Sequence, residues 1–154
     1  MADLNVLEDK INTVLKGETS RNALDFAAFL RENNITPAAH EGGGWSIMRG
    51  DDDIGFIIVD GAEQIPGPWT VWFNTCDFDD DGADNSLKET AWSHASVCAH
   101  FATNGKDCGC GNQPGFTRTI FGKEFKNRCH SPLMFTDPDA ATLAHVKRLM
   151  LALK

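Results

Sequence analysis

The stretch from Trp45 to Thr75, WSIMRGDDDIGFIIVDGAEQIPGPWTVWFNT, decides the fold. Its apolar residues recur with a period of two, which is typical of β-strands and predicts strands at 45–49, 54–60 and 69–75. Turn residues fill both gaps, including an Ile-Pro-Gly-Pro run suited to a type II turn. Because connections this short join antiparallel neighbours, we expect at least part of the sheet to be antiparallel.

The middle strand of this stretch is apolar on both faces, so we expect it to be central in the sheet. In the third strand, Trp69 and Phe73 share one face and Trp72 lies on the other. One of the two faces must therefore expose or specially cover an aromatic ring. The residues that we expect to be mostly buried are Phe56, Ile58, Val71, Phe73, Leu24, Leu30, Val146 and Met150.

Apolar residues at helical spacing predict helices at 3–16, 20–33 and 86–103, and a last helix that begins at Asp137-Pro138. A capping box from Ser86 to Glu89 is expected to begin the third helix. Short strands are predicted at 116–121 and 133–135. Together these elements predict an α+β fold, a two-layer sandwich in which helices pack on one face of a mainly antiparallel sheet, with residues 1–154 forming a single domain.

A chain of 154 residues that is 42% hydrophobic and 23% charged is typical of one globular domain. No apolar run approaches the roughly 20 residues of a membrane helix. Residues 1–16 lack the basic start and cleavage site of a signal peptide. We therefore expect a cytoplasmic monomer or homodimer without membrane association, whose five cysteines are thiols or metal ligands rather than disulfides.

The formal net charge of −8 argues against general nucleic-acid binding, which needs Lys and Arg opposite phosphates. Residues 1–115 carry 7 basic and 19 acidic side chains, whereas residues 116–154 carry 7 basic and 3 acidic ones. Either the two parts pack together with complementary charge, or Arg118, Lys123, Lys126 and Arg128 face an anionic ligand. The first interpretation is favoured, because charged runs are mostly solvated faces.

Four of the five cysteines fall within 32 residues, and this cluster predicts a metal site. The candidate ligands are Cys98, Cys108, Cys110 and Cys129, with His94 in reserve because it lies four residues before Cys98 on the predicted helix. Thiolates bind zinc tetrahedrally, so a structural or regulatory zinc site is the function that the sequence favours. The alternative is ordinary free thiols, with a Cys108–Cys110 disulfide as a less favoured variant.

Three tryptophans on the predicted sheet offer a second function. Trp45, Trp69 and Trp72 predict an aromatic pocket for a small apolar or planar ligand in a binding or sensor domain. The competing interpretation is core packing against the helices, which is where large aromatic side chains usually lie.

A third function is a thiol-dependent enzyme. Cys108 or Cys110 is then the nucleophile, and His94 or His130 is the base that activates it.

The acidic segment from Asp77 to Gly82 resembles the start of a calcium loop, with carboxylates at its first, third and fifth positions and glycine at the sixth. The twelfth position, which should supply a bidentate glutamate, is Lys88. We therefore expect residues 77–84 to form an exposed acidic loop that binds no calcium tightly.

Three segments resemble a group of small, uncharacterised bacterial proteins. They are Asp60–Thr70 (DGAEQIPGPWT), Thr119–Phe125 (TIFGKEF) with Cys129 after it, and Phe135–Asp139 (FTDPD). The resemblance covers roughly the last two-thirds of the chain and implies no activity and no catalytic residues. In that group cysteines lie just before the glycine-and-proline loop; here Phe101 stands where another cysteine is expected, and extra residues precede Cys108.

Overall fold

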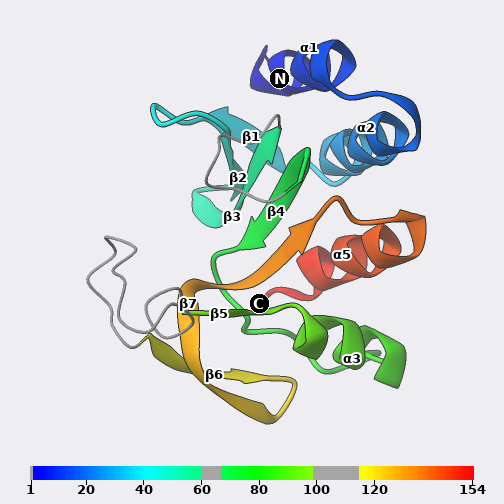
Figure 1. Ribbon diagram of the computed structural model, residues 1–154. Coiled ribbons are helices and arrows are strands. Elements are labelled where there is room, and N and C mark those ends of the chain that lie inside the picture. Colours follow the sequence, from blue (N-terminus) through cyan, green and yellow to red (C-terminus); the bar gives the residue numbers. More distant parts are fainter. Residues whose placement is uncertain (1, 60–66, 99–114) are drawn as a thin grey trace.

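The fold is seen in a computed structural model that describes residues 2–59, 67–98 and 115–154. Within these residues one sheet holds its strands in the order β1-β2-β3-β4-β7-β5, with β6 also paired to β7, and every pairing is antiparallel (Figure 1). The strands are β1 (Thr36–Ala39), β2 (Trp45–Arg49), β3 (Asp52–Val59), β4 (Trp69–Phe73), β5 (Ala95–Val97), β6 (Phe116–Ile120) and β7 (Lys123–Thr136). The helices are α1 (Ala2–Val14), α2 (Gly17–Glu32), α3 (Asn85–Ser93) and α5 (Ala140–Ala152).

These helices lie on one side of the sheet, which Figure 1 shows as a layer beside the strands. Alternate residues of the central strands form the covered face. They are Trp45, Ile47, Ile57, Val59, Trp69, Val71, Phe73, Leu133 and Phe135. The helix α2 packs directly on β4, since the ring centroids of Phe26 and Trp69 are 6.0 Å apart. The predicted α+β fold with helices on one face of an antiparallel sheet is therefore confirmed.

Each long helix buries one apolar stripe against this face. In α1 the stripe is Leu4, Leu7 and Ile11, and in α5 it includes Val146 and Met150. These residues recur three or four positions apart, so they project from one side of their helix. None of the described helices is long and apolar enough to cross a membrane.

The residues that cap α3 and α5 differ from the sequence prediction. The carboxylate of Asp84 accepts a hydrogen bond from the backbone N–H of Leu87 and caps α3, whereas the Oγ of Ser86 lies 3.3 Å from a ring nitrogen of His145. The predicted Ser86 capping box is therefore wrong. Asp139, not Asp137, caps α5.

The opposite face of the sheet corrects part of the burial prediction. Val71, Phe73, Leu30, Val146 and Met150 are fully buried, as expected. Phe56, Ile58 and Leu24 are only half-buried. Phe56 and Ile58 alternate with Ile57 along β3, so they project from the face that lies away from the described helices.

The chain between α3 and β7 also differs from the sequence prediction. The helix expected at 86–103 ends at Ser93, and β5 follows it and pairs with β7; residues 99–103 lie outside the described part. The φ and ψ of His94 are −108° and 12°, which lie outside the helical range, so the helix does not continue through this residue. The strand predicted at 133–135 is the end of the 14-residue β7.

Candidate ligand-binding site

A hollow of about 400 Å3 lies on the sheet face away from the described helices. We call it the open-face hollow. Its described lining residues are His40, Ser46, Asp53, Phe56, Ile58, Trp72, Asn74, Cys129 and Ser131. They come from β2, β3, β4, β7 and the connections beside them, so the sheet itself forms the floor.

The floor of the open-face hollow is aromatic and aliphatic. Phe56 of β3 and Trp72 of β4 are directly paired across the sheet, and their ring centroids lie 6.0 Å apart at an angle of 48°. The ring of His40 meets Phe56 edge-on at 5.4 Å and 88°. Ile58 extends the apolar surface along β3. This geometry provides a rigid, half-buried surface on which a flat molecule can stack.

Hydrogen-bonded polar side chains form one wall of the hollow. One carboxylate oxygen of Asp53 accepts from the hydroxyl of Ser46 at 3.0 Å, and the other accepts from the amide nitrogen of Asn74 at 2.8 Å. The amide oxygen of Asn74 accepts in turn from the hydroxyl of Ser131 at 3.4 Å. These bonds fix the direction of the Asp53 carboxylate before any ligand arrives.

The turn between β1 and β2 holds His40 at the edge of the hollow. Its backbone N–H donates to the carbonyl of Gly44 at 3.1 Å, and its Nδ1 accepts from the backbone N–H of Gly42 at 3.1 Å. An accepting Nδ1 requires a neutral ring with its proton on Nε2. His40 therefore presents an N–H donor at Nε2 and an aromatic face.

The structure does not bring the three predicted tryptophans together. Trp45 and Trp69 are buried on the helix-covered face, and Trp72 lies on the opposite face in the open-face hollow. The indole nitrogens of Trp45 and Trp69 are buried without a hydrogen-bond partner in the described part of the chain. The core interpretation therefore fits Trp45 and Trp69, and Trp72 is the tryptophan available to a ligand.

The predicted metal ligands are divided between described and undescribed residues, because Cys108 and Cys110 lie outside the described ranges. Cys98 follows β5 rather than a helix, is 2% exposed, and its backbone N–H donates to the carbonyl of Asn127 in β7 at 2.7 Å. Cys129 is two residues further along β7 and lines the open-face hollow. No group of three or more potential metal-binding side chains occurs within the residues that the structure describes.

His94 follows α3 directly, so it does not share a helix with Cys98 as predicted. Its ring stacks on Phe135 with centroids 4.4 Å apart, and its Nδ1 lies 2.8 Å from the carbonyl oxygen of Thr90. Because a carbonyl only accepts, Nδ1 carries the proton, and in the neutral ring Nε2 then has the lone pair. His130, the other candidate base, is exposed near Phe116.

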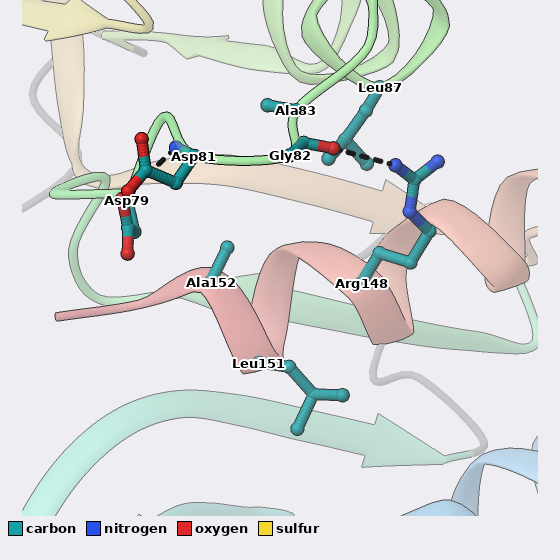
Figure 2. A pocket seen from close by; sticks show the side chains of 8 residues that line it. All are labelled: Asp79, Asp81, Gly82, Ala83, Leu87, Arg148, Leu151 and Ala152. Carbon is teal, nitrogen blue, oxygen red and sulfur yellow. Dashed lines mark hydrogen bonds between the residues drawn. The ribbon is translucent and has the colours of Figure 1, made fainter.

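The acidic loop at 77–84 borders a second hollow of about 300 Å3, shown in Figure 2. Asp79 and Asp81 lie on one side of it and Arg148 on the other, where the guanidinium contacts Asp84 at 3.1 Å and the carbonyl of Gly82 at 3.5 Å.

Other carboxylates of this loop pair separately with basic side chains. Lys88 contacts Asp80 at 2.8 Å, and Lys154 contacts Asp77 at 3.5 Å. The acidic residues of the loop are exposed as predicted, whereas Phe78 is buried. Asp77, Asp80 and Asp84 thus pair with three different cations. The described lining of the second hollow contains no aromatic side chain, so the open-face hollow is the better candidate site.

Three basic side chains of β6 and β7 pack on aromatic rings. The guanidinium of Arg118 lies 4.6 Å from the ring centroid of Phe116, and that of Arg128 lies 5.1 Å from Phe125. The ammonium of Lys123 lies 5.1 Å from the Trp92 ring. These internal cation–π contacts support the favoured interpretation, in which this charge contributes to packing within the fold.

Sequence reasoning found Trp72 and Cys129 but missed the polar wall. Asp53 and Asn74 each stand at the end of a strand, and the pairing of β2, β3 and β4 brings them together. Asn74 lies two residues after Trp72, and this spacing in the sequence indicates that the two side chains share one face of the sheet. Comparison of the chain with models of protein families, with curated protein sequences and with solved structures finds no match in any of the three.

Proposed function

We propose that the protein is a small-molecule-binding domain whose site is the open-face hollow. The observation that supports this function is the half-buried Phe56–Trp72 pair beside the hydrogen-bonded Asp53–Asn74 wall. Ligand sites combine apolar and aromatic lining with a few oriented polar groups, typically in roughly 300–1,000 Å3. A planar or apolar ligand body would cover the rings, and its polar group would meet the wall.

Removal of the indole tests this function. Phenethyl alcohol is a suitable probe because it carries one aromatic ring and one neutral polar group. Its binding can be followed by two-dimensional NMR through the shifts of backbone amides around the hollow. Trp72→Ala should weaken binding by about fivefold, since an aromatic contact contributes roughly 0.5–1.5 kcal/mol beyond its buried area.

The control is Leu151→Ala, because Leu151 lies on α5, is 56% exposed and does not line the open-face hollow. This variant should bind the probe like the unchanged protein. If phenethyl alcohol shifts no amide near the hollow, or if both variants bind it equally well, the proposed function is wrong.

The second candidate is the zinc site of Cys98, Cys108, Cys110 and Cys129, with His94 in reserve, and two observations favour it. Cys98 and Cys129 belong to strand segments that are neighbours at the β5–β7 pairing. His94 donates its Nδ1 proton to a backbone carbonyl, which is the arrangement that orients metal-binding histidines and leaves Nε2 for the metal.

Elemental analysis of protein purified without a chelating column tests the zinc site. We expect about one zinc per chain. Cys129→Ser should lower zinc content and thermal stability together, because binding free energy at a structural site is also folding free energy. Metal-free protein whose stability is unaffected by EDTA would exclude the site. Iodoacetamide labelling of Cys108 and Cys110 then tests the thiol-dependent enzyme, since an activated thiolate reacts far faster than an ordinary thiol.

A further inference from the structure

We infer that the ligand of the open-face hollow is an organic cation, whose ammonium group meets Asp53 while its apolar body lies on Phe56 and Trp72. This inference rests on the proposed function, because it names the class of molecule that the same site binds. Charge, hydrogen bonding and ring geometry each support it.

The charge of the hollow favours a cation. Of its described lining residues, Asp53 alone carries a formal charge, since the accepting Nδ1 of His40 requires a neutral ring. Within the described part of the chain, no Lys or Arg forms an ion pair with Asp53. Arg49, the nearest basic residue along the chain, donates instead to the carbonyls of Leu153 and Lys154. An anionic ligand would meet an uncompensated negative charge in a chain of net charge −8.

The hydrogen bonds of Asp53 leave room for a ligand donor. Each carboxylate oxygen accepts one bond within the protein, from Ser46 or from Asn74. A carboxylate accepts at about four positions, so these bonds orient the group and leave further positions for an ammonium. Both protein donors are neutral, so the full negative charge of Asp53 is available to the ligand.

The aromatic floor adds a second attraction for a cation. The faces of Trp and Phe rings are negative, and an ammonium within about 6 Å of a ring centroid is attracted to them. The Phe56 and Trp72 centroids are 6.0 Å apart, so a group above this pair can contact both rings. The site therefore suits an amine with an apolar or aryl body, bound between a carboxylate and two rings.

Three probes that share one phenyl ring separate charge from shape: phenethylamine, phenethyl alcohol and phenylacetate. We expect phenethylamine to bind about fivefold tighter than the alcohol at low ionic strength, because an exposed ion pair contributes up to about 1 kcal/mol. Phenylacetate should bind most weakly. The amine advantage should shrink as salt is added, because salt screens exposed charges.

Asp53→Asn removes the charge while an amide of similar shape stays in the wall. It should bring the amine and the alcohol to equal affinity, because only the amine loses an ion pair. Asp52→Asn is the matched control, since Asp52 is the neighbouring carboxylate and does not line the hollow; it should preserve the advantage.

The inference is overturned if the amine and the alcohol bind equally, if the amine advantage survives Asp53→Asn, or if Asp52→Asn removes it to the same extent. Each of these results leaves the proposed function standing, provided that the alcohol binds at the hollow. If none of the three probes binds there, the proposed function fails as well.

Discussion

Gly44→Ala tests whether the turn between β1 and β2 packs on the floor of the open-face hollow. Gly44 has a φ of +78°, and an added β-carbon would lie 2.7 Å from the Ile57 carbonyl oxygen, 2.8 Å from Ile58 and 2.9 Å from Phe56. Gly43 is the matched control, because its φ is +90° and an added β-carbon meets nothing within 4 Å. Both variants carry the cost of a left-handed residue, about 1–2 kcal/mol. They also share the effect of alanine on the unfolded chain, which cancels in the comparison.

The difference between these two variants therefore measures the packing contacts. Overpacking typically costs roughly 1–3 kcal/mol, so Gly44→Ala should be less stable than Gly43→Ala by about 2 kcal/mol. With an m-value near 2 kcal/mol per molar urea, the midpoints of urea unfolding should differ by about 1 M. Tryptophan fluorescence can follow the transition, and Gly44→Ala should also weaken probe binding by displacing Phe56. Equal midpoints would refute the packing of Gly44 on the hollow floor.

Three further predictions address the acid stability, the thiols and the central strand. The hydrogen bond from the Leu87 N–H holds the pKa of Asp84 below its ordinary value. The stability that this carboxylate contributes is therefore present at neutral pH and lost as pH falls below roughly 4. Asp84→Asn keeps a capping oxygen, so its urea midpoint should fall less on acidification than that of the unchanged protein. Burial raises the pKa of the Cys76 thiol. At neutral pH iodoacetamide should therefore label Cys76 in urea but not in the native protein, and fast labelling of the native protein would contradict the burial of this thiol. An added β-carbon at Gly55 would lie 2.4 Å from the Trp72 carbonyl oxygen, so Gly55→Ala should lower the free energy of unfolding by about 2 kcal/mol or more, and an unchanged urea midpoint would rule out this close approach.

The sequence predicted the central strands because their apolar period is unambiguous. Trp45–Arg49 is β2 with the predicted bounds, and Trp69–Phe73 begins where the pattern begins. The strand β1 was missed, because it is only four residues long and contains Pro37, a residue type that is rare within strands. Since β1 is an edge strand with one neighbour in the described sheet, a proline is tolerated there.

Tertiary pairing explains the errors in the second half. The residues after Ser93 were assigned to a helix, yet β5 forms there because β7 offers it a hydrogen-bonding edge. Similarly, the first part of β7 is rich in polar residues and gives no clear period of two, and its pairing with β6 decides its structure. Local propensity cannot reveal a partner strand that lies far away in sequence.

The candidate site was predictable only in part. Trp72 was recognised as the aromatic residue on the face opposite Trp69 and Phe73, and it lines the open-face hollow. The polar wall depends on contacts between residues that are distant in sequence: Asp53 and Asn74 are 21 positions apart, and Asn74 and Ser131 are 57 positions apart. Such contacts follow from strand register, which the sequence did not specify across β7.

The strand β3 connects the fold with the proposed function. An apolar run on both faces usually indicates a strand buried on both sides, but the described helices cover one face only. Phe56 and Trp72 are therefore larger and more apolar than a solvated sheet face requires. A protein partner could cover such a face, but the cores of protein interfaces are depleted of charged residues. Here the Asp53 carboxylate is held by two hydrogen bonds and lines the same hollow as these rings. An oriented charge beside an aromatic floor is typical of a site for one small ligand, so we favour the ligand over the partner.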